Sequence, residues 1–148
     1  MLIARNQEGK LVSALETSLQ RKESYSCPGC QGVVLLRHGQ VMCPHFAHKS
    51  LQDCQFFSEN ESDQHLSLKA ALYKSLVNHG EKVSIEKVLS EMGQIADLFV
   101  GDSLALEVQC SRLSQQRLRE RTCAYHQAGY EVRWLLGEEL WLNGRLTD

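Results

Sequence analysis

Six cysteines are spread unevenly along this chain, and their placement constrains the fold more than any other feature of the sequence. Four lie between residues 27 and 54, and two stand apart downstream. Because the first ten residues, MLIARNQEGK, contain no apolar signal segment, the cysteines are expected to be metal ligands or free thiols rather than disulfides. This predicts two modules, residues 1–57 organised around a metal and residues 58–148 without one of that kind.

Length and composition limit the possible functions. A chain of 148 residues that is 43% hydrophobic is long and apolar enough to bury a core. Its formal net charge of −2 argues against a protein that binds nucleic acid through overall positive charge. No apolar stretch approaches the roughly 18 residues of a membrane helix, so a cytoplasmic protein without a membrane partner is expected.

The first module contains the motif CPGCQGVVLLRHGQVMCPHFAHKSLQDC, which is typical of a small zinc-binding unit. Turn residues predict short strands at residues 2–5, 11–14, 33–37 and 40–42. The spacing of Cys27 and Cys30 directs two thiolates at one point, and zinc requires four sulfur or nitrogen ligands. His48 and Cys54 are the preferred second pair. His45 is an alternative ligand, although on a strand it would point away from His48.

A four-cysteine site is a second possibility for this module. Cys43 would then join Cys27, Cys30 and Cys54, a set that also admits an iron–sulfur cluster. Cys43 sits beside a proline directly after a predicted strand, which makes this arrangement less favourable than the one with histidine.

The second module reads as a mixed α/β unit. Ser58 or Asn60 can cap a helix that continues to His79, and Ser114 can cap another that ends near Gly129. Strands are predicted at 83–89, 95–100, 104–110 and 131–137. Because a strand, a helix and a strand follow one another at the end, the last two strands are expected to pair in parallel.

Acidic side chains interrupt the apolar pattern of two neighbouring strands in this module. Alternation places Asp97 on one face of its strand and Glu107 on a half-buried face of the next. A buried carboxylate without a partner is costly, and a shared Mg²⁺ or Mn²⁺ ion would satisfy both acids. Glu61, His65 and Lys69 follow at helical spacing along the edge of the first helix.

Six short segments occur in a characteristic order: CPGC, PHFAH, ESDQHLSLK, IADLFV, LEVQCS and RERTCAY. As a set they resemble the competence protein CoiA family of naturally transformable bacteria. The resemblance implies an α/β fold of mixed sheet, with a PD-(D/E)xK restriction-endonuclease-like core preceded by a small β-rich zinc-binding module. Members of that family usually extend well past Asp148, so this chain is expected to be an N-terminal portion or a short homologue.

The resemblance also implies roles for individual residues. Asp97 and Glu107 match the acids that bind Mg²⁺ or Mn²⁺, and Glu61 matches an additional acid. Gln109 stands where lysine is usual and would orient the attacking water, while Lys69 or His65 would stabilise phosphate charge or move a proton. In the same interpretation, the DNA backbone would be held by Ser111 and Arg121.

Two functions are therefore carried forward. The first is a metal-dependent deoxyribonuclease acting on incoming DNA, expected to be single-stranded, during natural transformation and recombination. The alternative is a catalytically inactive DNA-binding or recombination-mediator module of the same fold, which would recruit recombination proteins. Glutamine at position 109 and the acidic net charge favour the alternative, whereas buried carboxylates favour the enzyme.

Overall fold

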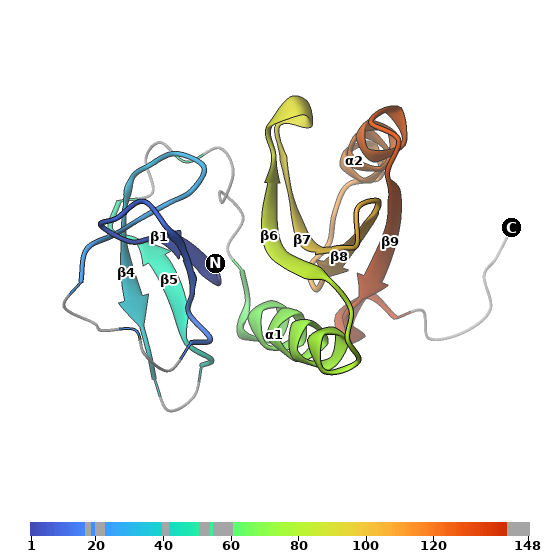
Figure 1. Ribbon diagram of the computed structural model, residues 1–148. Helices are drawn as coiled ribbons and strands as arrows, with labels where there is room; N and C mark the ends of the chain where they lie inside the picture. The colour runs from blue at the N-terminus through green and yellow to red at the C-terminus, as the bar shows by residue number, and fades with distance from the viewer. Residues whose placement is uncertain (17–18, 20–22, 40–41, 51–53, 55–60, 142–148) are drawn as a thin grey trace, which may run out of the picture.

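The computed structural model is a mixed α/β protein with two separate β-sheets, and the helix α1, Asp63–Asn78, lies against the second of them (Figure 1). It describes residues 1–16, 19, 23–39, 42–50, 54 and 61–141. This confirms the expected fold class. In the described residues no helix combines the length and the apolar character needed to cross a bilayer.

The first sheet is antiparallel throughout and has the strand order β2-β1-β3-β4-β5. Its core contains Tyr25 and Phe46, whose rings are 5.0 Å apart between centroids. The strands are short, as expected for a small β-rich unit: β1 Ile3–Arg5, β2 Leu11–Ser13, β3 Tyr25–Ser26, β4 Val33–Arg37 and β5 His45–His48.

The pairing of β4 differs from the predicted hairpin with residues 40–42. Residues 40 and 41 lie outside the described part of the chain, and Met42 is in a bend. The partner of β4 is β5, in a register that runs from Val34 opposite His48 to Arg37 opposite His45. This register buries Phe46, which is 1% exposed, so the need to cover an aromatic ring outweighs the proximity of the shorter loop.

The second sheet has the strand order β6-β7-β8-β9. The first three strands form an antiparallel meander, and β8 and β9 pair in parallel across the connecting helix α2, as predicted. Gly101, at φ +59°, makes the turn between β7 and β8. The elements are α1 Asp63–Asn78, β6 Val83–Leu89, β7 Gln94–Val100, β8 Leu104–Gln109, α2 Gln115–Gln127 and β9 Glu131–Leu136, with 3₁₀ turns at Ser90–Met92 and Glu138–Leu140.

Serine side chains begin both helices. The Ser114 hydroxyl accepts a hydrogen bond from the backbone N–H of Arg117, which confirms the predicted cap of α2. The cap of α1 is Ser62, whose hydroxyl accepts from the His65 N–H. The caps predicted for α1, Ser58 and Asn60, lie outside the described residues.

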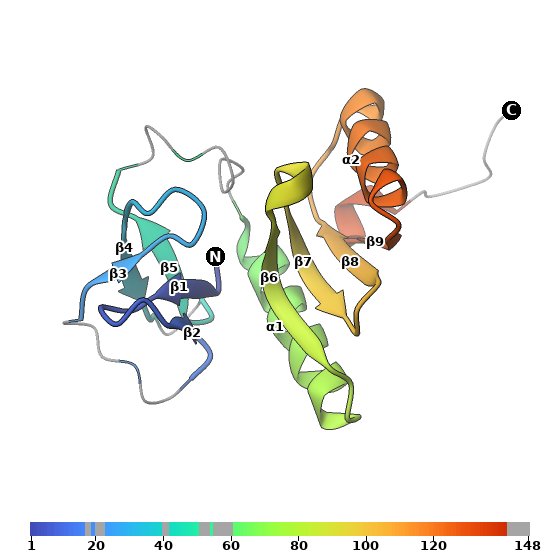
Figure 2. The same ribbon diagram turned by 45° about the horizontal axis from the view of Figure 1, so that its top comes forward.

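The two helices cover opposite faces of the second sheet (Figure 2). Leu66 and Ala70 of α1 share a core with β6 and β7, while Tyr125 of α2 belongs to a separate core. The core beneath α1 also contains Leu2 and Ile3 from the start of the chain. The two sheets are therefore joined by shared apolar packing as well as by the polypeptide.

One irregularity in β6 reorients the polar residues. Glu86 has a left-handed φ of +50°, and the pairing of β6 with β7 passes from Ile85 opposite Leu98 to Lys87 opposite Ala96. Glu86 and Asp97 are left between these pairs, and both side chains contact Lys69 on α1. The strict alternation predicted from the sequence, with Asp97 and Phe99 on one face, is therefore broken, because Phe99 lies in the core of α2.

Candidate metal centre and acid cluster

Four sulfur and nitrogen ligands converge in the first module, and we call this group the Cys/His cluster. It consists of Cys27, Cys30, His48 and Cys54, with all ligand atoms within 4.8 Å of one another. The Sγ atoms of Cys27 and Cys54 are 3.9 Å apart, and Cys30 Sγ is 3.4 Å from His48 Nε2. These separations suit tetrahedral coordination, in which two sulfurs each about 2.3 Å from one ion lie roughly 3.8 Å apart.

The turn around Cys27 and Cys30 is built to hold negative sulfur. The backbone N–H groups of Gly29 and Gly32 point at Cys27 Sγ and Cys30 Sγ, each over 3.4 Å. A Cβ atom added at Gly32 would lie 3.2 Å from Cys30 Sγ, so the backbone approaches the sulfur as closely as a glycine permits. Gln31 adopts a left-handed φ of +63° to close the turn.

The electrostatics of the Cys/His cluster favour an external cation. Burial raises the pKa of Cys27 to about 12, so a thiolate there requires a positive partner. Burial also lowers the pKa of His48, which keeps its imidazole neutral as metal coordination requires. These four residues are the set preferred in the sequence analysis.

The two alternative ligands of the first module face elsewhere. The Nδ1 atom of His45 is 3.0 Å from the backbone oxygen of Cys43, and neither residue belongs to the Cys/His cluster. Cys43 packs against the core beneath α1. Of the ligand sets considered for the first module, the described geometry brings together only the one with His48 and Cys54.

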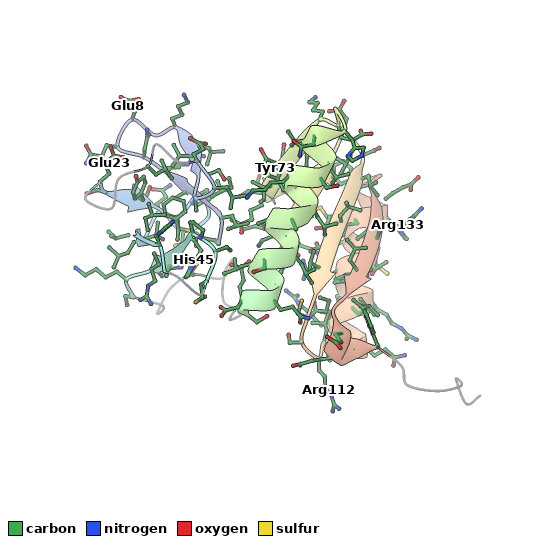
Figure 3. The ribbon with its side chains drawn as sticks, turned by 90° about the horizontal axis from the view of Figure 1, so that it is seen from below. Glu8, Glu23, His45, Tyr73, Arg112 and Arg133 are labelled. Carbon is green, nitrogen blue, oxygen red and sulfur yellow. The ribbon has the colours of Figure 1, made fainter. Side chains whose placement is uncertain are left out.

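A second polar group lies where α1 faces the irregularity of β6 and β7, and we call it the Lys69 cluster. The Lys69 ammonium, 1% exposed, contacts three carboxylates: Glu61, Glu86 at 2.7 Å and Asp97 at 3.3 Å. His65 Nε2 is 3.1 Å from Asp97 Oδ2. Figure 3 shows α1 between the first module and the second sheet, so this cluster lies at their junction.

The charges of the Lys69 cluster are strongly coupled. Burial alone would raise the pKa of Glu61, but Lys69 and the α-amino group of Met1, 2.5 Å away, lower it to about 2. Burial would also raise the pKa of Asp97, and Lys69 and His65 lower it instead. The three carboxylates outweigh burial at Lys69 and raise its pKa. The carboxylates of Glu61 and Asp97 and the ammonium of Lys69 are therefore charged at neutral pH.

Three of these residues could hold a divalent ion. Ligand atoms of Glu61, His65 and Asp97 all lie within 4.8 Å of one another. Asp97 Oδ2 also accepts a hydrogen bond of 2.9 Å from the Val108 N–H, which fixes the carboxylate against β8. Two carboxylates and an imidazole are suitable ligands for Mn²⁺, and the carboxylates also suit Mg²⁺.

Glu107 does not join this group in the structure. Its carboxylate accepts a hydrogen bond of 2.7 Å from Arg121 and another from the Tyr125 hydroxyl, both on α2. Asp97 turns toward α1, so the two acids that were expected to share a face are directed to opposite sides of the sheet. Burial, and next the charge of Asp97, raise the pKa of Glu107 to about 7.

The other predicted site residues are distributed around the end of β8. The Gln109 amide donates to the backbone oxygen of Ser111 over 2.8 Å, and its Nε2 is 3.3 Å from the Ser111 hydroxyl. Gln109 is thus engaged by the segment after β8 rather than by the Lys69 cluster. Arg121, besides pairing with Glu107, lies over the Trp134 ring at 5.2 Å from its centroid.

Two members of these networks were not identified from the sequence. Glu86 lies within a predicted strand, and nothing in its neighbours indicates the left-handed conformation that turns it toward Lys69. Tyr125 donates its hydroxyl hydrogen bond to Glu107 from a fully buried position. A signal existed only for Tyr125, because Arg121 and Tyr125 are spaced by one helical turn.

Comparison with known proteins gives matches along both modules. Residues 61–145 match the family model described as "Competence protein CoiA, nuclease-like domain", and residues 10–57 match "Competence protein CoiA, N-terminal domain". The competence protein CoiA of Bacillus subtilis (strain 168) is 28% identical over 130 residues, which are 86% of this chain and 35% of that protein. The chain therefore spans about a third of the length of this curated relative. No solved structure matches the chain.

Proposed function

This chain belongs to the competence protein CoiA family, and from that premise we propose that its second module is a divalent-metal-dependent deoxyribonuclease with a PD-(D/E)xK-type core. The observation that carries the proposal is the convergence of Glu61, His65 and Asp97 beside a buried lysine. The substrate would be incoming DNA in single-stranded form, met in the cytoplasm during natural transformation.

In this proposal Asp97 is the central ligand of Mg²⁺ or Mn²⁺, with Glu61 and His65 completing the protein's share of the coordination. A bound divalent ion would supply an activated water and neutralise charge on the scissile phosphate. The ordered carboxylate of Asp97, held by the Val108 N–H and by His65, supports this role because it is already oriented before an ion binds.

Lys69 supplies the positive charge that Gln109 lacks. Its ammonium lies among the same carboxylates that would hold the ion, so it would balance their charge before binding and stabilise phosphate charge afterwards. Gln109 ends β8, Ser111 follows it and Arg121 lies on α2. In this proposal Gln109 orients water, while Ser111 and Arg121 contact the DNA backbone.

Glu107 is the second proposed carboxylate ligand, and it competes with Glu61 for that role. Its ionisation is opposed by the charge of Asp97, and a cation between the two acids would relieve this repulsion. To reach such a cation, Glu107 would have to give up its hydrogen bonds with Arg121 and Tyr125. Separate alanine variants of Glu61 and Glu107 distinguish the two ligand sets.

The test is cleavage of labelled single- and double-stranded DNA by the purified chain with Mn²⁺, with Mg²⁺ and with chelator. We expect metal-dependent cleavage that Asp97→Ala lowers by at least about 100-fold, since loss of an outer-shell partner alone costs roughly 10- to 100-fold. The matched control is Asp102→Ala, whose carboxylate is exposed in the turn after β7. Equal cleavage by both variants would identify a contaminating nuclease.

For the Cys/His cluster we propose structural zinc. The set of three thiolates and one imidazole is closed, which is typical of zinc sites that support folding rather than catalysis. Elemental analysis of the purified chain should give one zinc per molecule, lost in Cys27→Ser and retained in Cys123→Ser, where the cysteine is exposed. Iron in place of zinc would contradict this assignment.

A second candidate function is a DNA-binding or recombination-mediator module without catalysis. The observation that favours it is that Lys69 already pairs with the carboxylates, while Glu107 is occupied by Arg121 and Tyr125. DNA binding that is retained by the purified chain, together with no cleavage in Mn²⁺, would select this function and direct the search to recombination proteins as partners.

A further inference from the structure

Glu86 is a buried acid that the proposed chemistry does not use. It is 3% exposed and has the left-handed backbone described above. It accepts hydrogen bonds of 2.7 Å from the Leu2 N–H and 2.9 Å from the Ile3 N–H, and it lies 2.7 Å from the Lys69 ammonium. The hydrogen bond between Leu2 and Glu86 joins residues that are 84 positions apart in the sequence.

The backbone conformation of Glu86 indicates that the contact is specific. A residue with a side chain is disfavoured at positive φ, and such conformations persist where surrounding interactions require them. Here the conformation directs the carboxylate to α1, where regular alternation after Ile85 would direct it away. There the carboxylate meets the Lys69 ammonium and accepts hydrogen bonds from two backbone N–H groups.

Glu86 bears directly on the position of Lys69. A lysine side chain has several rotatable bonds, so its ammonium is placed only where its partners hold it. Glu86 lies outside the three residues that could hold an ion, and its side chain is shielded from solvent. Its carboxylate is therefore an anchor for Lys69, whereas Asp97 and Glu61 remain the groups that an ion and a phosphate would meet.

Hydrogen bonds and short backbone segments connect Glu86 to the strand that carries a ligand of the Cys/His cluster. After Leu2 and Ile3, the next link is the Met1 backbone oxygen, which accepts from the Phe46 N–H over 2.8 Å. Phe46 lies on β5, the strand that carries the ligand His48. The start of the chain thus contacts both Glu86 and β5: its backbone is hydrogen-bonded to each of them, and the Leu2 and Ile3 side chains pack beneath α1.

We propose that Glu86 is a positioning residue that fixes Lys69 within the Lys69 cluster. Through its contacts with the first residues of the chain, Glu86 also couples the first module to the nuclease site. Loss of the metal in the first module would then disturb Lys69 in the second. The effect on cleavage rests on the proposed function, whereas the position of Lys69 and the coupling between modules are measured without DNA.

The first experiment compares Glu86→Gln with Glu81→Gln, a matched change at an exposed position after α1. In the unmodified protein, NMR should show a slowly exchanging Lys69 ammonium and strong exchange protection of the Leu2 and Ile3 amides. We expect Glu86→Gln to shift or remove the ammonium signal and to lower kcat about 10- to 100-fold with little change in KM. Glu81→Gln should match the unmodified protein in every measurement.

The second experiment removes the metal of the first module through Cys54→Ser, with Cys123→Ser as its control. We expect the Leu2 and Ile3 amides to exchange at least about tenfold faster in Cys54→Ser, and the Lys69 signal to change. A Lys69 signal that is the same in Cys54→Ser and Cys123→Ser would overturn the coupling between modules.

The outcomes separate this inference from the proposed function. If Glu86→Gln fails to fold, hydrogen exchange in the unmodified protein still tests the inference. Leu2 and Ile3 amides that exchange without protection would overturn it. If the protein cleaves no DNA but Glu86→Gln alters the Lys69 signal, the nuclease proposal fails and the positioning role stands. If cleavage is present and Glu86→Gln behaves as Glu81→Gln does, the positioning role fails alone.

Discussion

The two polar clusters of this protein satisfy their charges in opposite ways. The Cys/His cluster gathers four ligands with no ammonium or guanidinium group among them, so thiolates there would depend on an ion from outside. The Lys69 cluster gathers three carboxylates around an ammonium supplied by the chain itself. The first site is therefore expected to fold with its metal, and the second to fold without one.

This difference follows from the chemistry of the ligands. Thiolates bind soft or borderline ions far more strongly than they bind ammonium groups, so a lysine cannot replace zinc. Carboxylates bind lysine and hard divalent ions through the same oxygen atoms. An internal cation can therefore hold a carboxylate site in shape until a divalent ion and a phosphate arrive.

The largest expected effect is the loss of the first site's metal. Structural zinc supplies on the order of 10 kcal/mol of apparent folding free energy in small zinc-binding peptides, so Cys27→Ser should unfold the first module. Near-ultraviolet circular dichroism, which reports the packed Tyr25 and Phe46 rings, measures this. Wild-type spectra in Cys27→Ser, with Cys123→Ser as reference, would show that this cluster is no more metal-dependent than the other.

Removal of the internal cation should be the next largest effect. Lys69→Met leaves three carboxylates without their shared partner, which should lower the free energy of unfolding by roughly 3–5 kcal/mol in urea titrations. Lys82→Met is the control, because Lys82 is 79% exposed and its ion pair with Asp102 contributes little.

Mn²⁺ sharpens the same comparison. If the carboxylates can exchange lysine for a divalent ion, Mn²⁺ should restore part of the stability lost in Lys69→Met and have a smaller effect on the unmodified protein. No stabilisation of Lys69→Met by millimolar Mn²⁺ would remove the basis for an ion at Glu61 and Asp97.

The pH dependence of the free energy of unfolding tests the raised pKa of Glu107, which lies on the face of the sheet that α2 covers. The pKa of Glu107 rises from its ordinary 4.5 to about 7 on folding, so the folded protein binds more protons than the unfolded chain between these values. Stability from this group is therefore present at low pH and lost as the pH rises through about 7. Urea unfolding at pH 5 and pH 8 should show this loss, and Glu107→Gln should reduce it.

Glu61 should titrate in the opposite sense and in a different window. Its lowered pKa of about 2 contributes stability that is present above about pH 4.5 and is lost on acidification toward pH 2.

The control for Glu107→Gln is Glu131→Gln, whose carboxylate is exposed at the start of β9. A pH profile that is the same in both variants would contradict the pKa assigned to Glu107.

The smallest effect is expected at Gly32. A methyl group there would meet Cys30 Sγ at 3.2 Å, and the sulfur can yield by a few tenths of an ångström. Gly32→Ala should therefore weaken metal binding by about tenfold or less, which corresponds to at most roughly 1.4 kcal/mol. Competition with a chromophoric chelator measures the affinity, and a loss of all metal would show that the turn is more rigid than its geometry indicates.

Local signals predicted much of this architecture. The cap at Ser114 and the spacing of Cys27 and Cys30 each depend on neighbouring residues, and each is found where it was expected. The parallel pairing of β8 with β9 followed from the order of elements, because a crossover helix permits it.

The features that escaped prediction depend on contacts between distant residues. The orientation of Asp97 follows from the break in alternation opposite Glu86, and no local pattern encodes that break. The helical spacing of the sequence places Lys69 at the edge of the first helix, yet the residue is buried because the start of the chain covers α1. The partners of Glu107 come from α2, whose packing face depends on the whole sheet.

The packing of Leu2 and Ile3 beneath α1 has a consequence for how the protein is made. During translation these residues leave the ribosome long before Ile85 and Leu98, against which they finally pack. Until then, the apolar side chains of Leu2 and Ile3 lack part of their final packing, although earlier residues such as Leu15 and Leu66 belong to the same core. Contacts of such long range slow folding, so the nascent protein is expected to complete its native structure only after most of the second sheet has been synthesised.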